Sequence, residues 1–171
     1  MEDVMNRKVA RWLIPSLVIL FILPLTSMAA GRFVDNGDGT VTDLQQGLMW
    51  GAFDNQGDIS WQEAKRWVGF TFPYTIEKTY DNWRLPTVSE LRSLYVPNQE
   101  HRGGYQADCG KTVHIVPQIH LSCAWVWSAE TRSITARVFN FSRGNSYMDR
   151  MATRRGFRAL AVRTIKEKDG R

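Results

Sequence analysis

The stretch that decides the fold is "YDNWRLPTVSELRSL", residues 80–94. Trp83 and Leu85 alternate with Arg84, which predicts a short extended segment with Trp83 on the core side and Arg84 on the opposite face. Pro86 ends this segment, because the residue before a proline avoids helical geometry. Arg84 has two interpretations, a ligand contact or a pair with a buried carboxylate. The second is favoured, because a buried arginine must be paired to be tolerated.

A helix follows the proline at once. Thr87 and Glu90 have the spacing of a capping box, in which each side chain accepts a hydrogen bond from the backbone of the other residue. Leu91, Leu94 and Tyr95 then recur on one helical face, which predicts that this face is buried. Strand, proline turn and helix therefore succeed one another within a few residues.

The segments before this stretch predict a hairpin and another helix. In "FVDNGDGTVTDLQQGLMW", residues 33–50, apolar residues alternate around Asn-Gly and Asp-Gly, which are typical of hairpin turns. The run also resembles part of a calcium loop, but Gln46 stands where that loop needs a bidentate Glu, so the hairpin is favoured. In "SWQEAKRWV", residues 60–68, Ser60 and Glu63 predict a second capping box.

The segments after this stretch predict mainly strands. Residues 97–121 are rich in Gly, Pro, His and Gln and predict a long irregular loop. Residues 123–130 predict a strand, residues 136–152 a hairpin that turns at Arg143–Asn145, and residues 156–163 a last strand. Hairpin, two helices and several strands in this order indicate a single compact α+β domain.

The N-terminus predicts a secretory signal peptide over residues 1–29. Arg7, Lys8 and Arg11 precede a short apolar run, and Ser27 and Ala29 supply the small residues before a cleavage site. The run is short for a membrane span, although an uncleaved anchor is the alternative and is the one way we expect this chain to touch a membrane. The expected domain covers residues 30–165, a charged tail covers 166–171, and the protein is expected in the periplasm or outside the cell.

The two cysteines, Cys109 and Cys123, have two interpretations. With His114 and His120 they form a set of metal-ligand types, but their spacing matches no standard zinc pattern. An oxidising compartment and an even cysteine count favour a disulfide between them.

Charge is unevenly distributed along the chain. The formal net charge is +5, and residues 124–171 carry 11 Lys/Arg against 4 Asp/Glu, a net of +7, whereas residues 31–123 carry 8 against 11, a net of −3. A basic half favours an anionic partner. In an exported protein we expect a polysaccharide or another envelope component rather than nucleic acid. The candidate ligand-binding residues are Arg143, Tyr147, Arg150, Arg154, Arg155 and Arg158, because arginine binds sulfate and carboxylate through two hydrogen bonds. The alternative is a solvated basic hairpin whose arginines pair with acids from the first half of the chain.

Large apolar side chains supply the expected core, and no catalytic or cofactor pattern accompanies them. The core candidates are Trp50, Trp61, Trp83, Leu91, Trp125 and Trp127. "GNSYM" lacks the second Gly of a nucleophile elbow, and there is neither a phosphate-binding Gly loop nor an HExxH motif. We therefore expect no catalytic residue, no metal ligand and no cofactor.

Read in order, "FVDNGDGTVTDLQQGLMW", "SWQEAKRW", "DNWRLPTVSELRSL", "VWSAET" and "FNFSRG…GFRALAVR" resemble the Lcl C-terminal domain family, found at the C-terminus of the Legionella collagen-like adhesin. The resemblance covers nearly all of the chain after the signal segment. It implies a non-catalytic binding domain with a fold distantly similar to C-type lectins and to the formylglycine-generating enzyme. The adhesin binds sulfated polysaccharides.

Three functions follow as hypotheses. The first is a module that binds an anionic glycan. The second is a protein-interaction or assembly module of the envelope. The third and least favoured is an enzyme on a related fold.

Overall fold

The computed structural model describes residues 31–97 and 104–166. The predicted signal segment, and the predicted tail apart from Lys166, lie outside the described residues. The first sheet is antiparallel and has the order β1-β2-β3-β10, formed by β1 Phe33–Asp35, β2 Thr40–Asp43, β3 Leu48–Gly51 and β10 Val162–Thr164. The hairpin predicted around Asp35–Gly39 is confirmed, because β1 and β2 flank this turn.

Both predicted helices begin with the capping boxes that the sequence indicates. Ser60 and Glu63 cap α1, Trp61–Arg66, and Thr87 and Glu90 cap α2, Val88–Leu94. After α1 the chain continues as a π-helical turn, Trp67–Thr71, and a 3₁₀ turn, Phe72–Tyr74. The helical segment therefore runs to Tyr74, beyond the residues 60–68 that the sequence pattern predicts.

The stretch at residues 80–94 joins the first sheet to α2. The backbone of Arg84 bonds to Val162 of β10 in both directions, at 2.9 and 3.0 Å. Trp83 and Leu85 are buried on one side, whereas the Arg84 guanidinium turns to the other side and holds the Glu90 carboxylate with two hydrogen bonds of 2.7 and 2.8 Å. The expected pairing of Arg84 with a carboxylate is confirmed, and the partner is the capping residue of α2.

The second large sheet has the order β8-β7-β6-β9. Its strands are β6 Trp125–Arg132, β7 Thr135–Asn140, β8 Asn145–Arg150 and β9 Phe157–Arg158. β9 pairs with β6 in parallel, and the other neighbours are antiparallel. The predicted hairpin of residues 136–152 is confirmed as β7 and β8. Gly144 in its turn has a φ of +69°, and a Cβ there would lie 2.5 Å from the Tyr95 ring.

The prediction of one continuous last strand over residues 156–163 is wrong, because two separate strands, β9 and β10, occupy this segment. The chain leaves the second sheet after β9 and enters the first sheet at β10. Between them, the N–H of Ala159 donates to Asn55 and the carbonyl of Ala161 accepts from Gly51. Arg158 and Leu160 are buried as fully as their neighbours, because this segment passes between the two sheets and both of its faces are covered.

The predicted irregular loop contains a short antiparallel pair, β4 Tyr105–Gln106 and β5 Thr112–Val113. The sequence does not reveal it, because each strand has two residues and no repeating apolar pattern. A disulfide joins Cys109 to Cys123 with 14 residues of sequence separation, as predicted.

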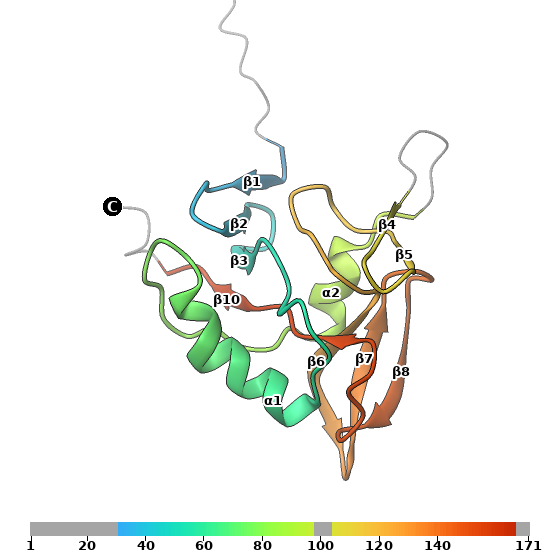
Figure 1. Ribbon diagram of the computed structural model, residues 1–171. Helices are drawn as coiled ribbons and strands as arrows, with labels where there is room; N and C mark the ends of the chain where they lie inside the picture. Colours follow the sequence, from blue (N-terminus) through green and yellow to red (C-terminus); the bar gives the residue numbers. More distant parts are fainter. Residues whose placement is uncertain (1–30, 98–103, 167–171) are drawn as a thin grey trace, which may run out of the picture.

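Two buried clusters form the core. Trp50 and Leu91 belong to the cluster around α2. Figure 1 shows α2 between the strands β1–β3 and the strands β6–β8. Trp83 and Trp127 belong to the cluster beside α1. Trp61 and Trp125 differ from the expectation, because they pack against this second cluster and keep part of each ring exposed. Among residues 31–97 and 104–166, no helix is long and apolar enough to cross a membrane.

Candidate functional site

The structure places Arg158 in the interior, where it does not belong to an exposed basic face. Its side chain is 8% exposed, Nε donates to Ser122 Oγ at 2.6 Å and Nη1 donates to Asp58 Oδ1 at 2.9 Å. The Asp54 carboxylate, which is 1% exposed, lies 3.8 Å from Nε. Burial raises the pKa of Asp54, and hydrogen bonds from Gln56 and Ser122 oppose the rise. Arg158 is thus a structural counter-ion shared by the buried Asp54 and the exposed Asp58.

The other four arginines of the predicted face separate into two places. Arg143 lies in the turn before β8 and Arg150 ends β8, so β8 places them about 17 Å or more apart at about 3.4 Å per residue. Arg154 pairs with Glu63 of α1 at 2.8 Å. Arg150 and Arg155 are exposed. Because strand residues alternate, Arg150 points to the sheet face opposite the one that carries Tyr147.

Arg143 and Tyr147 line a hollow of about 380 Å³ at the turn end of the second sheet. We call it the Trp125 hollow. Its lining consists of Lys111, Trp125, Asn140, Ser142, Arg143, Asn145 and Tyr147. The sequence predicts Arg143 and Tyr147 on a binding face and Trp125 in the core, and the other four residues are not among the predicted site residues.

The sheet register builds the floor of the Trp125 hollow. Trp125 of β6 stands opposite Asn140 of β7, and Asn140 stands opposite Asn145 of β8. Residues directly opposite one another share a face, so these three side chains form one row, and Tyr147 follows on the same face two residues along β8. Gly156, with a φ of +81°, lies against the back of Trp125, where a Cβ would come within 3.2 Å of the ring.

The disulfide brings Lys111 to this row. Lys111 follows Cys109 by two residues, and Cys123 precedes Trp125 by two, so the bond sets the two segments side by side. The Lys111 Nζ lies 5.8 Å from the centre of the Trp125 ring. The sequence contains a signal for this contact, because a Cys109–Cys123 bond places Lys111, two residues after Cys109, near Trp125, two residues after Cys123.

The Trp125 hollow is electropositive. No Asp or Glu lines it, and in the part of the chain that the structure describes neither Lys111 nor Arg143 has a carboxylate within ion-pair distance. Burial raises the pKa of Tyr147, and the charge of Asp149 raises it further, so the phenol keeps its proton at neutral pH. Two cations, two amides, a hydroxyl group and two aromatic rings therefore converge on one small space.

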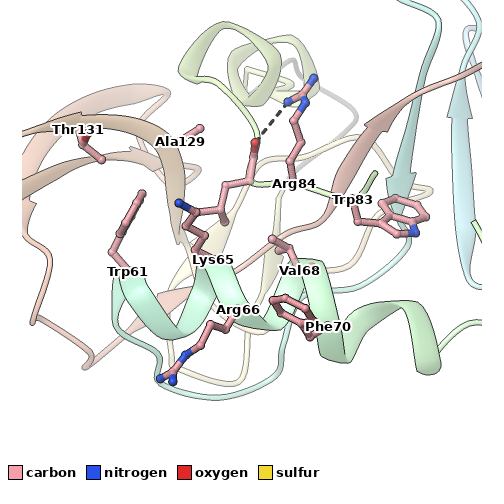
Figure 2. A pocket seen from close by; sticks show the side chains of 11 residues that line it. Trp61, Lys65, Arg66, Val68, Phe70, Trp83, Arg84, Ala129 and Thr131 are labelled. Carbon is pink, nitrogen blue, oxygen red and sulfur yellow. Dashed lines mark hydrogen bonds between the residues drawn. The ribbon is translucent and has the colours of Figure 1, made fainter. Parts of the chain in front are cut away.

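A larger hollow of about 590 Å³ lies beside α1, and we call it the Trp61 hollow (Figure 2). Its apolar lining comes from Trp61, Val68, Phe70, Trp83 and Leu85. The Trp61 Nε1 donates to the carbonyl of Ser128 at 2.8 Å, which fixes the ring. Figure 2 shows the Lys65 side chain beside Trp61 and the Arg66 guanidinium directed away from Val68.

The structure excludes the alternative metal site of Cys109, His114, His120 and Cys123. Cys109 and Cys123 are bonded to each other, so neither supplies a thiolate. His120 stacks on Tyr105 with ring centres 4.9 Å apart, and His114 lies edge-on to Tyr95. Within the described residues, no group of three or more His, Cys, Asp or Glu could hold a metal ion.

The fold and the hollow define an α+β domain with one disulfide and an electropositive surface site. The model of the Lcl C-terminal domain matches residues 39–163, and the chain belongs to this family. The match begins at the turn between β1 and β2 and ends in β10, so it covers β2 and β3 of the first large sheet, the whole second large sheet and the Trp125 hollow, and leaves out β1. A comparison with curated proteins finds no significant match.

Proposed function

We propose that this domain binds an anionic glycan, and that the Trp125 hollow holds one charged sugar unit of it. The observation that carries the proposal is the meeting of two cations without carboxylate partners, Lys111 and Arg143, with the partly exposed ring of Trp125 and the half-buried ring of Tyr147. A pair of aromatic rings beside unpaired cations matches a ligand that has both apolar C–H faces and negative charge.

Each group has a distinct role in this proposal. The Trp125 and Tyr147 rings present faces to the C–H side of a sugar ring. Arg143 binds a carboxylate or sulfate through two parallel hydrogen bonds, and Lys111 contributes a point charge. The side-chain amide of Asn145 can donate to and accept from sugar hydroxyl groups, whereas the Ser142 hydroxyl donates to the carbonyl of Thr112 and is left as an acceptor. Arg150 and Arg155 lie outside the hollow and receive no contact with the bound unit.

The proposed place of action is the periplasm or the exterior of the cell. The Cys109–Cys123 disulfide fits an oxidising compartment, and the adhesin family fits a role at the envelope. A scaffold of the C-type-lectin kind is part of the same proposal, because such a scaffold presents loops at one end for binding. The proposal assigns no catalytic step and no cofactor to the domain.

Chromatography on immobilised heparin with a salt gradient tests the proposal. The purified protein should bind at low ionic strength and elute as salt rises, because exposed charges are screened over about 8 Å at physiological ionic strength. The double variant K111E/R143E should elute at much lower salt or fail to bind. W125A and Y147A should each weaken binding without changing the net charge.

The matched control is the double variant R150E/R155E. It changes the net charge by the same amount at exposed positions that lie outside the Trp125 hollow. Elution close to that of the unmodified protein would support a local site. Equal losses for the two double variants would show that the column reads net charge alone, and unchanged elution of K111E/R143E would exclude the Trp125 hollow as the site.

A further inference from the structure

The face beside α1 exposes large aromatic side chains that the interior does not need. Phe70 is 75% exposed and Tyr74 is 89% exposed. Phe70 lies on the π-helical turn Trp67–Thr71. Such turns are rare in proteins, and those that occur are often found at functional sites. Exposed apolar side chains that gather in one place mark interaction surfaces more often than single exposed residues do.

Hollows lie on both sides of Phe70. The Trp61 hollow is on one side, and on the other side is a hollow of about 380 Å³ that Pro73 and Tyr74 help to line. The two share Gly69, Phe70 and Trp83 in their linings, so they are neighbours separated by the Phe70 side chain. Together the two hollows and the projecting Phe70 ring form an extended surface feature. Such a feature suits a peptide segment better than a single small molecule.

The charge of the Trp61 hollow selects the partner's chemistry. Three cations line it, Lys65, Arg66 and Arg84, and no carboxylate does. Arg84 is held by Glu90 at 2.7 Å, so it is neutralised within the protein. Lys65 has its Nζ 5.6 Å from the centre of the Trp61 ring, and within the described residues neither Lys65 nor Arg66 has a carboxylate within ion-pair distance.

We propose that this face docks an acidic segment of a partner protein, with one apolar side chain of that segment in the Trp61 hollow. The anchor would pack on Val68 and Leu85 between Trp61 and Phe70. A carboxylate next to the anchor would then meet Lys65, whose ammonium already lies along the Trp61 side of the hollow in Figure 2. This inference is independent of glycan binding, because the two hollows share no lining residue.

The test uses a fluorescein-labelled acidic peptide of Asp and Glu with one central Phe, and it measures fluorescence anisotropy. Two matched peptides serve as controls, one with Ser in place of Phe and one with Lys in place of every acid. The acidic Phe peptide should bind, and each control should bind at least about tenfold more weakly, since anchors and charge pairs at interface centres commonly count for that much. The Trp61 indole N–H resonance should shift during the titration.

Variants on the protein locate the contact. F70S and K65E should each weaken the peptide about tenfold, whereas K111E/R143E should leave its affinity unchanged. Phe70 and Lys65 are both exposed, so each variant is expected to fold, and circular dichroism checks this. Absence of peptide binding, or loss of binding in K111E/R143E instead, would overturn the proposal. Association of the protein with itself that F70S abolishes would replace the acidic segment with a second copy, and binding to anionic vesicles that F70S abolishes would replace it with a membrane surface.

Discussion

The Arg158 Nη1 donates to Asp58 Oδ1 at 2.9 Å, and the same carboxylate oxygen accepts the backbone N–H of Gly156 at 2.9 Å. These hydrogen bonds, from Gly156 first and from Arg158 second, lower the pKa of Asp58. Arg158 therefore connects the segment before α1 with β9, and Gly156, in the turn before β9, lies against Trp125. Arg158, which was predicted to contact an anionic glycan, instead belongs to the structure that supports the Trp125 hollow.

Replacing Arg158 with Ala should lower the free energy of unfolding by about 3–5 kcal/mol, because it leaves the buried carboxylate of Asp54 without its cation. The pKa of Asp54 is raised in the folded protein, so protonation at low pH favours folding. The deficit of R158A should therefore shrink as pH falls toward the usual Asp range. Urea unfolding at pH 7 and at acidic pH checks both points. R155A, at an exposed position, is the control, and an equal effect of R155A would contradict the assignment.

The Glu90→Gln variant should lose about 1 kcal/mol of stability at neutral pH, because Glu90 both caps α2 and holds Arg84. Burial raises the pKa of Glu90, but hydrogen bonds from Arg84 and Thr87 outweigh it, and the pKa lies below the usual value of 4.5. A lowered pKa stabilises the fold above pH 4.5, and this contribution disappears as pH falls through the folded value. Thermal melts of both proteins across pH should therefore converge in acid. A constant difference at every pH would show that the charge of Glu90 is unimportant.

Replacing Trp83 with Ala should lower the free energy of unfolding by about 3–5 kcal/mol, as truncation of a large buried aromatic does. Trp83 is 7% exposed, and its ring lies 4.7 Å from that of Phe72, nearly at a right angle. Chemical unfolding measures the loss, and F70S, at an exposed aromatic, should change stability by less than about 0.5 kcal/mol. A stable W83A protein with altered ligand binding would show that Trp83 is a binding residue.

Removing the disulfide with C109A/C123A should lower stability by about 3 kcal/mol on the chain-entropy account, given a loop of about 15 residues. Because Lys111 follows Cys109 by two residues, the same variant should also elute from heparin at lower salt than the unmodified protein. Thermal melting and the heparin column measure the two effects separately. Full heparin retention in a folded C109A/C123A protein would mean that the bond is not needed to position Lys111.

The sequence by itself determined the local structure of this protein. The even cysteine count predicts the Cys109–Cys123 bond, and the cost of an unpaired buried arginine predicts that Arg84 pairs with a carboxylate. Both capping boxes and the two hairpins depend on residues only a few positions apart in the chain. Local spacing encodes such features through backbone geometry, because side chains three or four residues apart, or two strands joined by a turn, meet in almost any fold. Membership of the Lcl C-terminal domain family, indicated by the same motifs, is likewise confirmed.

Tertiary structure alone decided which arginines face solvent and which residues share a hollow. Arg158 and Arg155 are three residues apart and identical in chemistry, yet one is buried because the chain there passes between two sheets. Lys111, Trp125 and Arg143 meet because a disulfide and a sheet register bring three distant segments together. Charge counts along a sequence average over both faces of a strand, so the prediction of an anionic partner drawn from them does not specify which side chains would contact it.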